Sequence, residues 1–153
     1  MHAHAEPNLN GAAFSATTHC LTGCAIGEIV GMAIATALGW GNLASIVLAV
    51  ALAFVFGYWL TMGPVLRAGL SLRQATGVAL AADTVSIAIM ELVDNAFVLA
   101  VPGAIEAGLG DAKFWWSILA GFAIAFGPAF PANHWLIGRG RGHAVAHAYH
   151  QHQ

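Results

Sequence analysis

The stretch HCLTGCAIGE, residues 19–28, holds the side chains of this chain that are best suited to binding a metal ion. His19 is followed by Cys20 and Cys24, the only two cysteines, and then by Glu28. Thiolate and imidazole groups are ligands for Cu(I) and Zn(II). On a helix, Cys20, Cys24 and Glu28 follow one another at i, i+4 spacing and form a stripe on one face. The stretch therefore predicts a soft-metal site, with Cu(I) preferred and Zn(II) second.

A second group of polar residues lies in DTVSIAIMELVDN, residues 83–95. On a helix, Met90 and Asp94 each fall within about 20° of Asp83, and Glu91 lies roughly 80° from Asp83. An Asp at the centre of a membrane helix costs about 2.5 to 3.5 kcal/mol, so we expect these carboxyl groups to face protein or water. Asp83, Glu91 and Asp94 are therefore candidates for a relay of protons or hard cations.

His134, in the stretch PANHWLIG, is the first candidate for a ligand from a different helix. It follows Pro128 and Pro131, and prolines kink a helix and free backbone carbonyl groups. In a bundle of antiparallel helices it lies at a depth that matches His19 and Cys20. The predicted metal ligands are His19, Cys20, Cys24, Glu28 and His134.

Four apolar segments must position these residues. The chain has 153 residues, of which 59% are hydrophobic and 8% charged, whereas soluble domains average about 25% charged residues. About 20 apolar residues cross a hydrocarbon core of about 30 Å. The segments run from Thr18 to Gly39, Leu43 to Met62, Thr76 to Val101 and Phe114 to Ile137. They predict an all-α, polytopic membrane protein folded as one four-transmembrane-helix bundle.

The ends of the chain are expected to lie outside this membrane domain. We predict a His-containing arm over residues 1–17, the four-helix domain over 18–137 and a His-rich tail over 138–153. Ser15, Thr17 and Thr18 are candidates for the N-cap of the first helix. Gly63 and Pro64 are expected to break the chain after the second helix. His-rich tracts often bind metal weakly, although these histidines need not be ligands. Arm and tail together contain His2, His4, His143, His147, His150 and His152.

The few basic residues predict the orientation of the bundle. Arg67 and Arg73 lie between the second and third segments, and Arg139 and Arg141 follow the fourth, whereas Lys113 lies on the opposite side. Basic residues concentrate in cytoplasmic loops, so both termini are expected in the cytoplasm (N-in/C-in) and the protein in the inner (cell) membrane. The first segment has no positive region before it and is expected to stay in the protein. A net charge of −2 gives no footprint for nucleic acid.

Small residues recur every four positions along the first segment. Such a stripe lets a neighbouring helix approach closely in lipid, and we expect that neighbour to bring ligands to the thiols. The short turn from Trp40 to Asn42 makes the first two helices antiparallel neighbours. The stripe consists of Gly23, Gly27, Gly31, Ala35 and Gly39.

The stretches HCLTGCAIGE, DTVSIAIMELVDN and PANHWLIGRG together resemble an uncharacterised bacterial family of small four-helix membrane proteins, catalogued as a domain of unknown function. The resemblance covers roughly residues 15–142, and the HCxxGC pattern is its most specific element. It implies a polytopic inner-membrane protein with a link to copper or heavy-metal handling. The positions it carries over are His19, Cys20, Cys24, Glu28, Asp83, Glu91, Asp94, Asn133 and His134.

These observations favour a membrane transporter or chaperone for a soft metal ion. Two alternatives stay open: a structural or assembly subunit of a larger membrane complex or homo-oligomer, and a proton or cation channel in which the cysteines are small buried hydrophobes. The chain shows no nucleophile and base pair, phosphate loop or dinucleotide fingerprint, so no enzyme activity is predicted.

Overall fold

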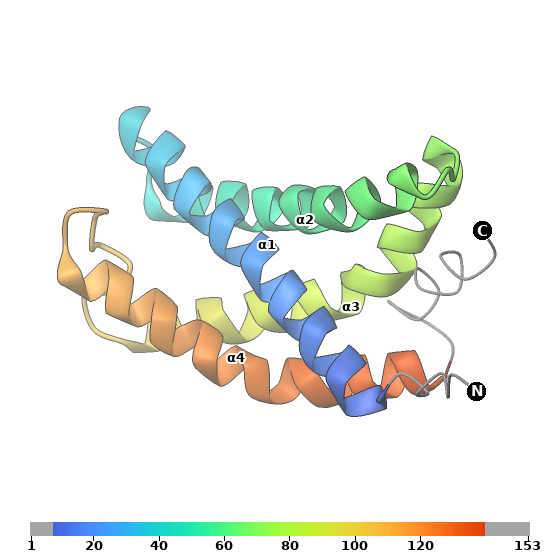
Figure 1. The fold of residues 1–153 in the computed structure, drawn as a ribbon. Helices are drawn as coiled ribbons and strands as arrows, with labels where there is room; N and C mark the ends of the chain where they lie inside the picture. Colours follow the sequence, from blue (N-terminus) through green and yellow to red (C-terminus); the bar gives the residue numbers. More distant parts are fainter. Residues whose placement is uncertain (1–7, 140–153) are drawn as a thin grey trace, which may run out of the picture.

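The protein folds into four long helices joined by short connections (Figure 1). The structure is a computed structural model and describes residues 8–139. The helices are α1 (Leu9–Ala37), α2 (Asn42–Arg67), α3 (Leu72–Ala100) and α4 (Ala112–Gly138). All four are long and apolar enough to cross a membrane. The predicted all-α, multi-pass, four-helix membrane protein is therefore confirmed, while the histidines at the two ends of the chain lie outside the described residues.

The bundle has two ends, which we name by the connections they hold. The terminal end contains the start of α1, the end of α4 and the α2–α3 turn, and it carries Arg67, Arg73 and Arg139. The distal end contains the α1–α2 turn and the α3–α4 loop, residues 101–111, and it carries Lys113. Figure 1 shows the start of α1 beside the end of α4, where Leu9 packs near Ile137. The basic residues are thus divided between the ends as expected, and N-in/C-in stays a prediction.

Helix α1 begins earlier than expected. The Asn8 side chain caps it by accepting a hydrogen bond of 3.1 Å from the backbone N–H of Asn10. Thr17 and Thr18 lie inside the helix, where their hydroxyl groups donate to carbonyl oxygens one turn earlier, at 2.7 and 2.9 Å. A threonine whose hydroxyl is satisfied in this way does not end a helix. The expected N-cap at Ser15, Thr17 or Thr18 is therefore wrong, and α1 extends into the predicted arm as far as Leu9.

Pro64, Pro128 and Pro131 lie within helices. Helix α2 continues through Gly63 and Pro64 to Arg67, so the expected break at Gly63 and Pro64 is wrong. Helix α4 likewise runs through Pro128 and Pro131. Membrane helices tolerate proline because neighbouring groups satisfy the freed backbone carbonyls. The chain turns only after residue 68, where Ser71 and Gln74 form a capping box at the start of α3.

Helices α1 and α2 pack along the stripe of small residues. A β-carbon added at Gly23 would lie 2.7 Å from the Cα of Gly57, and one at Gly31 would lie 2.6 Å from the Cα of Ala49. Only glycine permits this approach, so the predicted close packing is confirmed. The neighbour is α2, which brings no ionisable side chain to the interface. The expectation that the glycine-packed helix would bring ligands to the thiols is therefore wrong.

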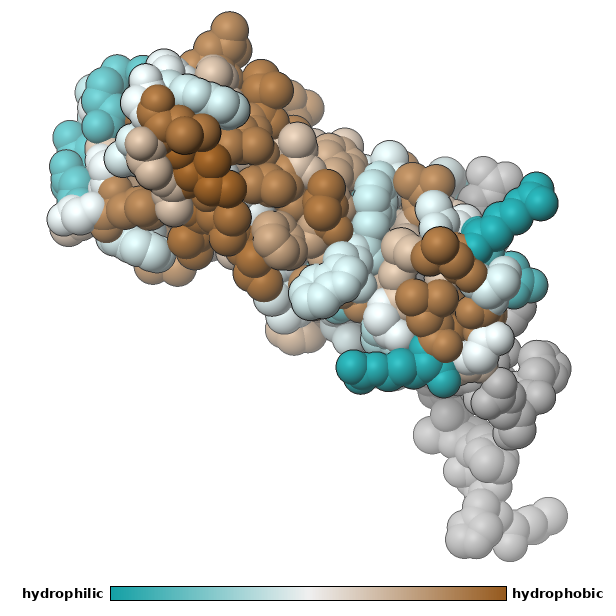
Figure 2. Space-filling view, turned by 90° about the horizontal axis from the view of Figure 1, so that it is seen from above, coloured by the Kyte–Doolittle hydropathy of each residue, from teal (hydrophilic) through white to brown (hydrophobic). Residues whose placement is uncertain are grey.

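The outer surface suits a lipid environment. Figure 2 shows hydrophobic residues over the middle of the molecule and hydrophilic residues gathered toward both ends. Exposed tryptophans lie toward the distal end at Trp40, Trp115 and Trp116, and toward the other end at Trp59 and Trp135. Tryptophan is enriched at both interfaces of a bilayer. The surface and the four apolar helices therefore support a membrane-embedded protein.

Candidate functional site

Thiol and carboxyl groups from α1 and α3 meet inside the bundle. Each residue of the predicted α1 stripe lies against one acidic residue of α3, and all of them are buried. The two helices run in the same direction, so the three pairs follow one another toward the distal end. We call this set the ladder. Its pairs are Cys20 with Asp83, Cys24 with Glu91, and Glu28 with Asp94.

The first pair is held by hydroxyl groups around it. The Cys20 thiol donates to Asp83 Oδ1 at 3.6 Å, and Ser86 lies within hydrogen-bonding reach of the same sulfur atom. Thr61 of α2 lies beside the Asp83 carboxyl group, and the Thr61 hydroxyl lies 3.0 Å from His19 Nε2. Thr61 therefore connects His19 to the first pair.

The second and third pairs lie nearer the distal end. The Cys24 thiol lies beside the Glu91 carboxyl group, and Asn95 fixes this carboxylate by donating from Nδ2 to Glu91 Oε2 at 3.3 Å. Glu28 faces Asp94. No described donor group bonds to either oxygen of Asp94 or to Oε2 of Glu28. Two carboxyl groups in contact bond to each other only when one carries a proton, so this pair is arranged to share one.

Helix α4 leaves space for the third pair. A β-carbon added at Gly121 would overlap the Asp94 carboxyl group and lie 3.0 Å from its Cγ atom. Gly121 is buried, so the Asp94 side chain rests against the backbone of α4. The absence of a side chain at this position therefore permits a second carboxyl group beside Glu28.

Within residues 8–139, the distal part of the ladder has no cationic partner. Among residues 8–139, the groups acting on Glu28, Glu91 and Asp94 are other carboxyls, a thiol and an amide. The Nζ of Lys113 instead donates to the carbonyl oxygen of Pro102 at 3.3 Å. A buried carboxylate without a counter-charge is strongly disfavoured in a membrane. Protons or added cations must therefore neutralise these groups.

Asn133 connects three helices on the terminal side of the ladder. Its Nδ2 donates to Thr17 Oγ1 of α1 at 3.0 Å and to Ser86 Oγ of α3 at 2.9 Å. All three side chains are fully or almost fully buried. The family resemblance carried over both Asn133 and His134, and His134 was the predicted ligand. The half-buried His134 ring lies 6.3 Å from that of Phe130 in the same helix. Consecutive helical residues differ by about 100° in direction, so Asn133 faces the bundle and His134 does not.

Replacing Asn133 by alanine is expected to lower the free energy of unfolding by about 1 to 3 kcal/mol, because interhelical hydrogen bonds in membranes contribute about 0.6 to 1.7 kcal/mol each. SDS-driven unfolding in mixed micelles measures this change. His134→Ala is the matched control, with an expected loss below about 1 kcal/mol. A larger loss for His134→Ala than for Asn133→Ala would contradict the assignment.

The predicted metal ligands do not form one assembled site. The structure brings Cys20, Cys24 and Glu28 to α3, places His19 beside Thr61 and leaves His134 beside Phe130. Within the described part of the chain, no three His, Cys, Asp or Glu side chains are grouped to hold a metal ion. The predicted relay residues on α3, by contrast, all belong to the ladder.

Several residues that shape the site were not singled out from the sequence. Thr61 and Gly121 are isolated small or hydroxylated residues in apolar segments, a pattern too common to indicate a role, and Thr17 was considered only as an N-cap. Ser86 carried a usable signal, because it is three residues from Asp83 and therefore on the same helical face. Its contacts with Asn133 and Cys20 confirm that position.

Four membrane-spanning helices around a buried ladder of thiol and carboxyl groups define a small multi-pass membrane protein with an ionisable interior. The chain belongs to the DUF4396 family, a domain of unknown function, whose family model matches residues 10–142. Searches of curated proteins and of solved structures found no match. The resemblance to an uncharacterised family is therefore confirmed.

Proposed function

We propose that this protein binds a thiophilic metal ion inside the bundle and carries it across the membrane. The observation that supports the proposal is the ladder, in which each of the two cysteines lies against a carboxyl group of α3. Mixed thiolate and carboxylate ligands suit Zn(II), whereas Cu(I) prefers sulfur. We therefore place Zn(II) ahead of Cu(I), which reverses the order expected from the sequence.

Binding would require a change at the interface between α1 and α3. No three ligands converge among the described residues, and α1 contacts α3 less extensively than it contacts α2 or α4. A small approach of α1 toward α3 would bring Cys20, Cys24 and the facing carboxyls around one ion. Thiol ligands lose their protons when they bind metal, so binding releases protons and strengthens as the pH rises. Glu28 and Asp94 would then pass the ion toward the distal end.

Metal affinity measured in nanodiscs tests this proposal. The six terminal histidines are first replaced by asparagine, because they could bind metal independently. Zn(II) and Cu(I) affinities are then measured by competition with a chromophoric chelator. The double variant Cys20→Ser, Cys24→Ser is expected to lose more than about 100-fold in affinity, since a ligand should matter at least as much as a second-shell partner. His134→Ala serves as the control and should bind as the parent does.

Two results would count against the proposal. If the double cysteine variant binds both metals as tightly as the parent, the thiols are not ligands. If His134→Ala loses affinity as strongly as the cysteine variant, the site includes α4 and differs from the ladder.

A second candidate function is proton conduction along the same ladder. The observation in its favour is the Glu28 and Asp94 pair, which is arranged to share a proton and has no cationic partner among the residues described. Proton flux in proteoliposomes that survives the loss of both thiols but disappears in Asp94→Asn would favour conduction over metal transport.

We further propose that the terminal end faces the cytoplasm across the inner membrane. Arg67, Arg73 and Arg139 lie at that end, opposite Lys113, and basic residues favour the cytoplasmic side. Labelling of single cysteines introduced at residues 70 and 108, in a background without Cys20 and Cys24, distinguishes the two sides.

A further inference from the structure

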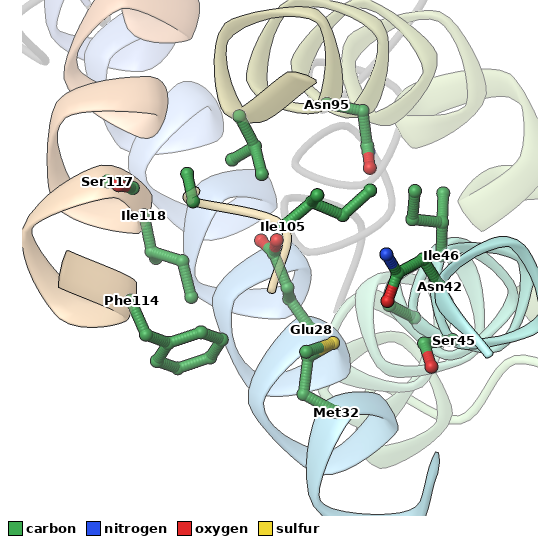
Figure 3. Close-up of a pocket in the computed structure, with 13 residues that line it drawn as sticks. Glu28, Met32, Asn42, Ser45, Ile46, Asn95, Ile105, Phe114, Ser117 and Ile118 are labelled. Carbon is green, nitrogen blue, oxygen red and sulfur yellow. The ribbon is translucent and has the colours of Figure 1, made fainter. Parts of the chain in front are cut away.

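A pocket lies at the distal end, between the ends of the helices and the α3–α4 loop (Figure 3). Its walls are mostly apolar and include Met32, Ile46, Ile105, Phe114 and Ile118. Apolar pockets with a few converging polar groups are the usual form of a small-molecule site. The polar groups of this pocket therefore indicate what it binds.

Two buried polar side chains that line the pocket have unpaired atoms. Glu28 is 8% exposed and Ser117 is 1% exposed. Neither Glu28 Oε2 nor Ser117 Oγ has a hydrogen-bond partner in the described part of the protein. Figure 3 shows the Glu28 carboxyl group pointing into the space between α4 and the α3–α4 loop. Buried polar atoms are nearly always paired, so a ligand or water is expected to complete them.

The charge and shape of the pocket select the class of ligand. Among the described residues that line it, Glu28 is the only ionisable one, so an anion would be repelled. A bare metal ion would find no group of three ligating side chains there. A neutral molecule would leave the carboxylate without a counter-charge. A cation with a short apolar part can pair with Glu28 through its charge and pack against the apolar walls. The ring of Phe114 also favours a cation nearby.

We propose that this pocket binds a small primary alkylammonium ion. Its ammonium group donates to Glu28 and Ser117, and its alkyl chain packs against Phe114. The site does not use the cysteines, so it stands whether or not the protein transports a metal ion. It occupies the distal side of the Glu28 and Asp94 pair, and a bound ammonium ion would supply the positive charge that these carboxyls do not receive from any residue between 8 and 139.

Calorimetric titration of the full-length protein in zwitterionic nanodiscs with n-propylammonium tests this site. We expect binding in about the millimolar range, as suits a ligand of so few atoms, and no binding of n-propanol, its neutral counterpart. Glu28→Gln should weaken binding at least about tenfold, because it removes one partner of a buried charged hydrogen bond. Glu106→Gln removes an exposed carboxylate at the same end and should change nothing.

A pocket-filling variant keeps the test independent of how Glu28→Gln folds. Ala104 lines the pocket and is buried, so Ala104→Leu should abolish binding while Glu28 stays in place. Equal binding of n-propanol, or an equal loss in Glu106→Gln, would overturn the proposal. Unchanged affinity in Ala104→Leu would place the ammonium ion elsewhere.

Discussion

Gly27→Ala is expected to be the most destabilising small substitution in the bundle. A β-carbon at Gly27 would overlap the backbone of Ala53 in α2, and a backbone contact cannot be relieved by turning a side chain. The two helices would have to separate along the stripe of small residues, so we expect a loss of at least about 1 to 3 kcal/mol in the free energy of unfolding. SDS-driven unfolding in mixed micelles gives the value.

Gly77→Ala is the matched control for that substitution. Gly77 lies in α3, and a β-carbon there would meet no atom within 4 Å. Alanine is the better helix former by about 1 kcal/mol, so this variant should be as stable as the parent or more so. Equal losses at Gly27 and Gly77 would show that α1 and α2 do not pack along the stripe of small residues.

Asp94→Asn is expected to stabilise the protein while abolishing the proposed Zn(II) transport. The Asp94 carboxyl group is fully buried, and neither of its oxygens accepts a bond from a described donor. An amide of nearly the same shape carries no charge into the membrane and can donate to Glu28, so we expect a gain of about 1 kcal/mol or more in the free energy of unfolding. Zn(II) flux in proteoliposomes should fall to the level of empty vesicles, because Asn cannot bind and release a proton or replace a charged ligand.

Asp111→Asn separates this effect from a general loss of charge. Asp111 is exposed and caps α4 through the backbone N–H of Lys113, and asparagine is an equally good N-cap. Both stability and flux should therefore equal those of the parent. A destabilised Asp94→Asn variant would show that the carboxyl group supports the fold. A variant with full flux would show that the carboxyl group takes no part in transport.

The number of helices and the buried face of α1 could be predicted from the sequence. Hydropathy determines the former, and the i, i+4 spacing of Cys20, Cys24 and Glu28 determines the latter. The ends of the helices could not be predicted in the same way. Thr17 and Pro64 usually indicate helix ends in water, but within a membrane helix the backbone has no solvent to bond with and the helix continues.

The composition of the site depended on contacts between helices. The sequence identified the acidic face of α3 but not its position opposite the cysteines, because a glycine stripe indicates close packing without specifying the neighbour. In the fourth helix, the residue that faces the bundle is Asn133 and not the adjacent His134. Which of two adjacent residues faces inward depends on how α4 is rotated about its axis, and the packing of the whole bundle sets that rotation.

The close packing of α1 against α2 has a consequence for how the helices can move. Because α1 and α2 approach backbone to backbone, we expect them to move together as one stiff hairpin against α3 and α4. The ladder lies on the boundary between this hairpin and α3. Asn133 of α4 crosses the same boundary through its hydrogen bond to Thr17 of α1. A rocking motion of the α1–α2 hairpin against α3 and α4 would open this boundary first at one face of the membrane and then at the other. The contacts between α1 and α2 would stay intact during such a motion.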